Sequence, residues 1–174
     1  MDTLRKIINK QNNADMCAVC GKINAHALGT DFYELEGGVV YSVTHGRNEH
    51  QSYPGRMHGG LITAVLDETI GRAIQIGSPE SWGVTSKIEV VFKKPVPLNE
   101  PIRCFGKITK TYSFAFTGKG YIEDADGNVL ACANASYVRV PVEKIVNGAG
   151  FTWENFPVND PPVSAAVLHP ELLE

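Results

Sequence analysis

The chain has 174 residues, which is enough for one domain with a hydrophobic core of its own. Its 16 basic and 19 acidic residues give a net charge of −3, so there is no electrostatic basis for binding nucleic acid or an anionic membrane. No apolar run approaches the roughly 18 residues of a membrane-spanning helix, and the polar N-terminal stretch does not resemble a secretory signal. We therefore expect a cytoplasmic protein.

Residues 1–29 predict a short helix followed by a tight turn. Leu4, Ile7 and Ile8 recur at helical spacing and predict the helix. The turn contains Cys17 and Cys20 in Cys-Ala-Val-Cys-Gly, the spacing of a zinc ligand pair or a redox pair. Three histidines are candidates to complete a zinc site: His26, His45 and His50. Because no second cysteine pair follows, we favour a plain turn with two reduced thiols, keep zinc as the minor alternative, and expect no cofactor.

Residues 30–141 predict the main domain, with an α+β fold. Two strands around a Gly-Gly turn come first, and a helix over residues 60–76 follows, ended by Gly-Ser-Pro. Four further strands are expected at residues 83–93, 102–111, 112–123 and 129–140. This order predicts a curved antiparallel sheet of five or six strands around one long central helix. Residues 142–174, rich in Pro, Gly and Asn, predict an irregular tail that is in part disordered.

The segment from Tyr53 to Glu68 carries most of the functional information. Turn residues lead into His-Gly-Gly at positions 58–60, and an apolar helical pattern begins directly behind them. A helix N-terminus offers free backbone N–H groups and the positive end of a dipole, which suit an oxyanion. Asp67 and Glu68 lie within the apolar run, where a carboxylate is costly to bury unless it is partnered or used. Together these features favour chemistry on a carbonyl group.

Each part of this motif also has a simpler interpretation. The His-Gly-Gly turn alone is compatible with an ordinary helix start, and an isolated acid is most often a solvated surface residue. Asp67 and Glu68 are about 100° apart on a helix, so they cannot both face one site well. We expect Glu68 to pair with Arg72, four residues further on. Asp67 is preferred because it shares a helical line with three small residues: Gly60, Ala64 and Gly71.

The order of these segments resembles the hotdog-fold acyl-CoA thioesterases, and within them the PaaI-like (phenylacetate-type) branch. The similarity covers roughly residues 15–140. The matching stretches are Cys-Ala-Val-Cys-Gly at 17–21, the run 50–60 continuing to Asp67 and Glu68, and the strand 84–92 followed by Pro95. The loop-to-helix stretch is the most specific, because the gap from His58 to Asp67 matches the family's motif.

This resemblance implies roles for individual residues. Gly59 would bind the thioester carbonyl oxygen through its backbone N–H, and Asp67 would act as nucleophile or general base. Thr85 or its neighbour on the next strand would assist. Where the family often has an Asn or Gln that orients water, this chain has Ser52, with Gln51 beside it. Five residues are candidates for substrate binding: His58, Gly60, Glu68, Ser86 and Arg56.

The spacing of the two main groups predicts an assembly. Asp67 lies eight residues after Gly59, which is about 12 Å along a helix axis. One carbonyl group cannot easily contact both in the same chain, so we expect a C₂ homodimer with two shared sites. The resemblance implies further pairing into a dimer of dimers. The expected activity is hydrolysis of a medium-chain or aromatic acyl-CoA. A hotdog hydratase or dehydratase and a non-catalytic acyl-CoA-binding protein are the alternatives.

Overall fold

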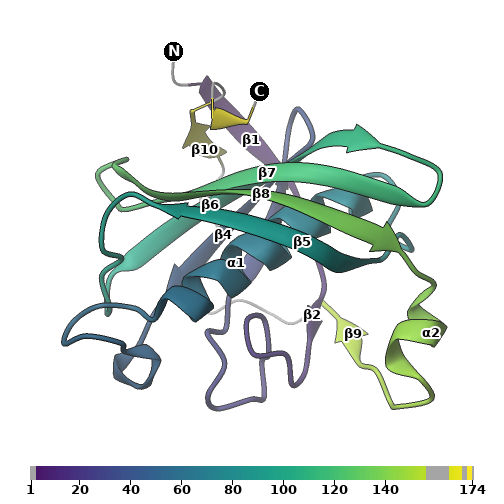
Figure 1. The fold of residues 1–174 in the computed structure, drawn as a ribbon, viewed down its shortest axis with the longest axis horizontal. Helices are drawn as coiled ribbons and strands as arrows, with labels where there is room; N and C mark the ends of the chain where they lie inside the picture. Colours follow the sequence, from purple (N-terminus) through teal and green to yellow (C-terminus); the bar gives the residue numbers. More distant parts are fainter. Residues whose placement is uncertain (1–2, 156–164, 170–171, 174) are drawn as a thin grey trace.

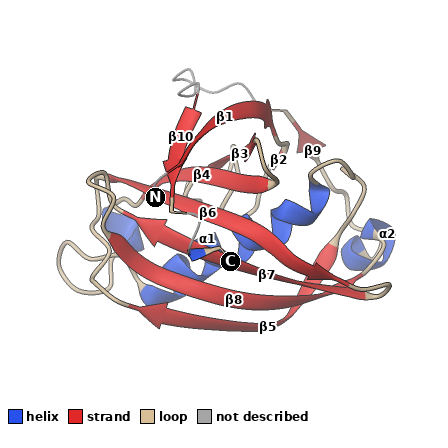
Figure 2. Ribbon diagram, turned by 90° about the horizontal axis from the view of Figure 1, so that it is seen from above, coloured by secondary structure: helices blue, strands red, loops and turns tan. Residues whose placement is uncertain are grey.

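An eight-stranded antiparallel sheet and one long helix make up most of the protein. The computed structural model describes residues 3–155, 165–169 and 172–173. The strands of the sheet are β1 (Thr3–Lys10), β3 (Asp31–Leu35), β4 (Val39–His45), β5 (Gly83–Phe92), β6 (Pro101–Thr111), β7 (Ala115–Glu123), β8 (Val129–Arg139) and β10 (Ala165–Leu168). Their spatial order is β10-β1-β3-β4-β6-β7-β8-β5. Helix α1 (Gly59–Arg72) crosses one face of this sheet and continues into the 3₁₀ turn η2 (Ala73–Gln75) (Figures 1 and 2).

The predicted α+β architecture is confirmed, and the central helix and the four strands after it lie within a few residues of their predicted bounds. The sheet has eight strands instead of the expected five or six. Four shorter elements complete the described chain: β2 (Asn13–Ala14), η1 (Asn48–His50), α2 (Val142–Val146) and β9 (Trp153–Glu154). No helix in the described ranges is both long and apolar enough to cross a bilayer.

The expected N-terminal helix is wrong, because residues 3–10 form strand β1. This strand pairs with β3 on one side and with β10 on the other. Leu4 and Ile8 are 67% and 59% exposed, so their helical spacing does not mark a buried face. A helix of this length is marginal by itself, since one turn must be nucleated for few hydrogen bonds. Pairing with two neighbouring strands gives the backbone N–H and C=O groups of residues 3–10 more hydrogen-bond partners than so short a helix would.

The C-terminal part is more regular than the irregular tail predicted for residues 142–174. It contributes α2, then β9, which pairs with β2, and finally the edge strand β10. The Trp153 ring of β9 lies over the Arg72 guanidinium at 4.6 Å, so this segment packs on the end of α1. The remaining expectation of partial disorder concerns residues 156–164, 170–171 and 174, which lie outside the described residues.

Helix α1 approaches the sheet closely because β6 and β7 present glycines beneath it. A methyl group on Gly106 would lie 2.7 Å from the Thr69 carbonyl oxygen and 2.8 Å from Cα of Ile70. One on Gly120 would lie 2.7 Å from Cγ1 of Ile70. Ile70 itself is fully buried in the core between α1 and the sheet. These glycines therefore set the height of α1 above the sheet, and with it the position of every group that α1 carries.

We expect Gly106→Ala to destabilise the protein by about 2 kcal/mol or more, because the added methyl group meets helix backbone that cannot rotate away. Thermal or denaturant-induced unfolding measures the change. Gly150→Ala is the matched control, since a methyl group there has no atom within 4 Å in the described part of the chain. Equal unfolding midpoints for the two variants would contradict the close approach of α1.

Candidate active site

The first feature of the site is the N-terminus of α1. His58 is the N-cap residue, and its Nδ1 accepts a hydrogen bond of 2.9 Å from the Gly60 N–H. The Gly60 N–H is therefore used by the cap, and a substrate-binding role for Gly60 stays a prediction. The Gly59 N–H has no acceptor among the described residues, as is usual for the first residue of a helix. A single free N–H at this helix start, that of Gly59, is the candidate oxyanion donor.

His50 holds the loop before α1 in place. The sequence presents this residue only as a candidate zinc ligand. His50 is buried, with Nδ1 accepting from the Arg47 N–H at 2.9 Å and the other ring nitrogen 3.0 Å from the His26 carbonyl oxygen. Its own carbonyl oxygen accepts from the His58 N–H at 2.9 Å. The helical cap is thus tied to a buried side chain, which fixes where the free N–H of α1 points.

The two candidates for orienting water lie in the exposed part of this loop. The Gln51 Oε1 accepts from the Gly55 N–H at 3.0 Å, so its acceptor already closes the turn. Ser52 is exposed, and its backbone N–H donates to the Arg56 carbonyl oxygen at 2.8 Å. Within the described chain, no hydrogen bond joins either residue to Asp67. A role for Ser52 or Gln51 therefore remains a prediction.

The second feature of the site is Asp67, eight residues further along α1. Its carboxylate is half-buried and accepts from the Thr85 hydroxyl, which lies 2.9 and 3.0 Å from the two carboxylate oxygens. The Tyr137 hydroxyl donates to the Asp67 backbone carbonyl at 2.8 Å. The predicted pairing of an acid on the helix with a hydroxyl on the next strand is present, and the hydroxyl is that of Thr85.

A β-bulge decides that Thr85, and not Ser86, faces the acid. Thr85 pairs with Tyr137 and Lys87 pairs with Ser136, so Ser86 is the extra residue in β5. Ile88 and Val90 pack against the core beneath α1. Strict alternation from them would turn Ser86 inward and Thr85 outward, and the bulge reverses this. Ser86 is exposed and donates to the Ser136 carbonyl oxygen at 3.0 Å.

Burial raises the pKa of the Asp67 carboxyl above its ordinary value, and the Thr85 hydrogen bond partly opposes this. If Asp67 acts as its carboxylate in a reaction at this site, the rate of that reaction falls as the pH decreases through this raised pKa. Thr85→Val removes the opposing hydrogen bond, so the acidic limb of the pH–rate profile moves to higher pH. Thr85→Ser, which keeps the hydroxyl, serves as the control. An unchanged limb in the valine variant would argue against Asp67 as the titrating group.

Among the described residues, no hydrogen bond joins the other predicted substrate-binding residues to the Asp67 carboxylate. Glu68 makes the expected pair with Arg72, at 3.0 and 2.7 Å from the Glu68 Oε1 to two guanidinium nitrogens. Arg56 is exposed on the loop, and Ser86 faces away as described. The line of small residues is also less open than expected, because a methyl group on Gly71 would lie 3.1 Å from the ring of Tyr137 in the same chain.

The cysteine pair lies beside Glu68 and not beside the histidines considered for a zinc site. Cys17 donates to the Glu68 Oε2 at 3.3 Å, and the ligand atoms of Cys17, Cys20 and Glu68 all lie within 4.8 Å of one another. Among the described residues, this group does not include the histidines named as candidates within the zinc alternative: His26, His45 and His50.

The two halves of the site lie apart within one chain but are linked by the edge strand β5. Gly59 and Asp67 are both on α1, about 12 Å apart along its axis. Thr85, near the start of β5, contacts Asp67. Phe92, the last residue of β5, has its ring beside Gly59, since a methyl group there would lie 3.6 Å from it. The start of β5 therefore contacts Asp67, and the end of β5 lies beside Gly59.

Comparison with known proteins gives one family and a set of similar folds. Residues 54–131 match the family described as the thioesterase superfamily. No curated protein matches the sequence significantly. A crystal structure of a thioesterase superfamily protein is 29% identical with a TM-score of 0.65, over 71% of this chain and 60% of that one. This chain thus spans less than two thirds of that protein's length.

Two further structures share the fold. The E. coli PaaI protein from the phenylacetic acid degradation operon is 16% identical with a TM-score of 0.60, covering 67% of this chain and 83% of that one. A hypothetical thioesterase with coenzyme A from Streptococcus pneumoniae is 19% identical with a TM-score of 0.58, covering 64% and 89%. The fold is the hotdog fold, and the predicted resemblance to the thioesterase superfamily is confirmed over residues 54–131.

Proposed function

We propose that this protein hydrolyses acyl-CoA thioesters, because residues 54–131 match the thioesterase superfamily. The observation that carries the proposal is the Asp67 carboxylate, half-buried and held by Thr85, on the same helix that begins with the free Gly59 N–H. The PaaI protein and the coenzyme A complex among the similar structures support acyl-CoA as the substrate class. We propose a medium-chain or aromatic acyl group and a cytoplasmic location.

The two halves of the site would perform complementary parts of the reaction. As the thioester carbonyl is attacked, negative charge develops on its oxygen, and the Gly59 N–H at the positive end of α1 stabilises it. Asp67 either attacks the carbonyl carbon, forming an anhydride that water then hydrolyses, or takes a proton from the attacking water. Both routes release coenzyme A as the thiol and the acyl group as a carboxylic acid. No metal or other cofactor takes part in either route.

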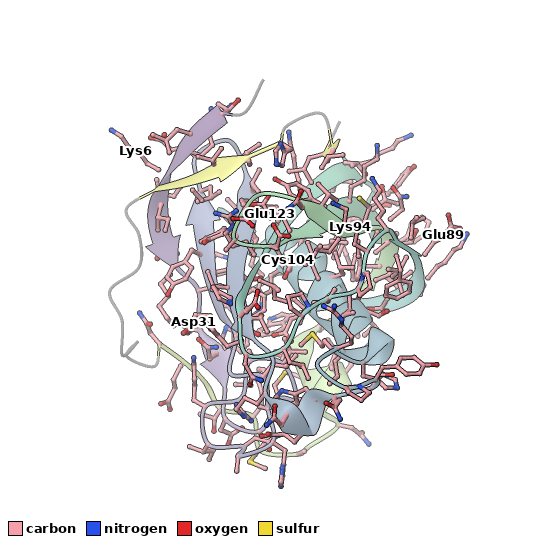
Figure 3. All side chains as sticks on the ribbon, turned by 90° about the vertical axis from the view of Figure 1, so that its left-hand side faces the viewer. Lys6, Asp31, Glu89, Lys94, Cys104 and Glu123 are labelled. Carbon is pink, nitrogen blue, oxygen red and sulfur yellow. The ribbon has the colours of Figure 1, made fainter. Side chains whose placement is uncertain are left out.

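A dimer formed along β5 would bring the two halves together. This strand ends the spatial order of the sheet, and no strand covers its outer edge in the described part of the chain. Figure 3 shows Glu89 of β5 and Lys6 of β1 at opposite sides of the molecule. Three large apolar side chains of β5 are exposed: Val84, Val91 and Phe92. A long exposed edge with apolar side chains favours pairing with another strand.

The register of that pairing follows from the two ends of β5. An antiparallel pair of β5 strands, with a twofold axis at Glu89 and Ser86 as the extra residue of the bulge, places Thr85 opposite Phe92 of the partner subunit. Since Thr85 lies against Asp67 and Phe92 lies against Gly59, the acid of one chain would approach the free N–H of its partner. We propose this C₂ homodimer with two shared sites. Its further pairing into a dimer of dimers is also proposed, on the resemblance alone.

Mixed dimers test the shared site. An Asp67→Asn chain lacks the acid and a Gly59→Pro chain lacks the N–H, so we expect each homodimer to be nearly inactive. In a mixed dimer, one site combines the intact Gly59 with the intact Asp67, while the other carries both changes. Co-expression in equal amounts should restore about a quarter of the wild-type rate, as random pairing in a C₂ dimer requires. If the mixture stays as inactive as its parents, the site lies within one chain.

Release of free thiol from a panel of acyl-CoAs tests the activity itself. Turnover that depends on Asp67 supports thioester hydrolysis, and the most rapidly cleaved member identifies the acyl class. Tight binding of acyl-CoA without thiol release from any member would instead favour the non-catalytic binding protein. Hydration of an enoyl-CoA without thiol release would favour the hydratase. The described site supports hydrolysis better, because His58 is occupied in capping α1 and does not face Asp67 in its own chain.

A further inference from the structure

A second group of reactive side chains lies beside α1, close to Glu68. The turn at residues 17–21 brings the thiols of Cys17 and Cys20 next to the Glu68 carboxylate, with all three ligand atoms within 4.8 Å of one another. Neither cysteine forms a disulfide. Cys20 is buried and Cys17 is partly exposed. The proposed hydrolysis uses none of these three side chains.

The turn directs backbone N–H groups at both sulfurs. The Cys17 Sγ accepts from two successive backbone N–H groups, those of Val19 at 3.3 Å and Cys20 at 3.4 Å. The Cys20 Sγ accepts from the Ala14 N–H at 3.4 Å. The turn itself is closed by the Gly21 N–H, which donates to the Cys17 carbonyl oxygen at 2.9 Å. Hydrogen bonds to a sulfur favour its thiolate form, which is the form that binds metal ions.

The Glu68 carboxylate is oriented so that one oxygen faces the sulfurs. Arg72 holds Oε1 through two of its nitrogens, at 3.0 and 2.7 Å, and leaves Oε2 directed at Cys17. The guanidinium is fixed in turn between two aromatic rings, 4.0 Å from the centre of Phe32 and 4.6 Å from that of Trp153. A ligand carboxylate held by a partner of this kind is typical of preorganised metal sites.

The geometry points to a zinc site formed by Cys17, Cys20 and Glu68, with its fourth position open to water. Tetrahedral zinc with these ligands needs separations of roughly 3.8 Å between sulfurs and roughly 3.5 Å between sulfur and oxygen. The observed 3.3 Å from the Cys17 Sγ to the Glu68 Oε2 is close to this. Two thiolates and a carboxylate carry three negative charges, which the divalent ion and the Arg72 guanidinium balance. Thiolate ligands also select zinc over magnesium or calcium.

The proposed site is the zinc alternative, with Glu68 as the third ligand, in place of the plain turn favoured from the sequence. It joins residues 13–23 to the middle of α1, one residue from Asp67, and so would stabilise the helix that carries both halves of the proposed active site. Its role is structural, because Asp67 and Glu68 point in different directions from the helix. The inference does not depend on the proposed thioesterase activity.

Metal analysis of the protein purified under reducing conditions tests the inference. We expect about one zinc ion per chain, lost in Cys17→Ser and weakened in Glu68→Gln, since the two thiolates remain. Cys132→Ser, a change to a half-buried thiol on β8, is the matched control and keeps full occupancy. Replacing zinc by Co²⁺ alone should produce a thiolate-to-metal charge-transfer band that Cys17→Ser abolishes. Removing zinc with a chelator should lower the unfolding temperature of the wild type, but not of Cys17→Ser.

Three results would overturn the site, and each is distinct from a failure to fold. The first is the absence of both zinc and the cobalt band in reduced protein whose circular dichroism is native. The second is metal binding at full strength in a Cys17→Ser variant with a native spectrum. The third is isolation of the chain with Cys17 and Cys20 joined in a disulfide that persists when zinc is supplied, which would make the pair a redox element.

Discussion

Asp67→Asn is expected to lower kcat by about 10²- to 10⁴-fold, the range for removing an essential acid or base. Asparagine has nearly the same shape, and its amide oxygen can still accept from the Thr85 hydroxyl, so substrate should still bind. The half-buried carboxylate is desolvated in the wild type, and the neutral amide should therefore not destabilise the fold. Initial rates of thiol release, with calorimetric binding of the same acyl-CoA, measure the two effects separately.

The unfolding temperature separates a chemical role of Asp67 from a structural one. If the asparagine variant unfolds at the wild-type temperature and binds acyl-CoA but does not turn it over, the acid participates in the chemistry. Near-wild-type turnover would remove Asp67 from the mechanism. Asp126→Asn, a change to an exposed acid in the turn between β7 and β8, is the matched control and should alter neither property.

The second large effect is expected for Gly59→Pro, which deletes one backbone N–H without changing a side chain that contacts substrate. Loss of a single oxyanion donor lowers kcat by about 10²- to 10³-fold. The first position of a helix is where proline is best tolerated, because its N–H has no partner within the helix. The preceding residue, His58, already has φ −66° and ψ 133°, the conformation that a following proline requires. The helix should therefore remain intact.

Gly59→Ala distinguishes loss of the N–H from crowding at the same position. Alanine keeps the donor, and its methyl group would lie 3.6 Å from the Phe92 ring, an ordinary contact distance. We expect this variant to retain most of the wild-type rate while the proline variant loses it. Equal loss in both would mean that space at Gly59, and not its N–H, is what the reaction needs.

Features with a strong local pattern were predicted well from the sequence. The bounds of α1 follow from a long run of apolar residues at helical spacing that ends at Gly-Ser-Pro. The Glu68–Arg72 pair is a direct consequence of residues four apart on a helix. The spacing of Gly59 and Asp67 sets their separation along α1, whatever surrounds the helix.

Features that depend on distant segments were not predictable in this way. Residues 3–10 are a strand because β3 and β10 pair with them, and their own pattern carries little information about either partner. The choice between Thr85 and Ser86 depends on the register of β5 against β8, some fifty residues later. His58 accepts a hydrogen bond from the Gly60 N–H, two residues away in the sequence. The spacing of the two residues does not predict this bond, because it depends on the rotamer of the His58 side chain.

The sequence by itself therefore determined the helix, the strands that follow it, and the fact that a backbone donor and an acid lie too far apart on that helix to share one carbonyl. Only the tertiary structure decided which hydroxyl holds the acid, which N–H of the helix start is free, and that two cysteines lie against Glu68 about fifty residues away. The physical reason is that spacing along one element is set by backbone geometry, while contacts between elements depend on how strands pair and how closely a helix can pack on them.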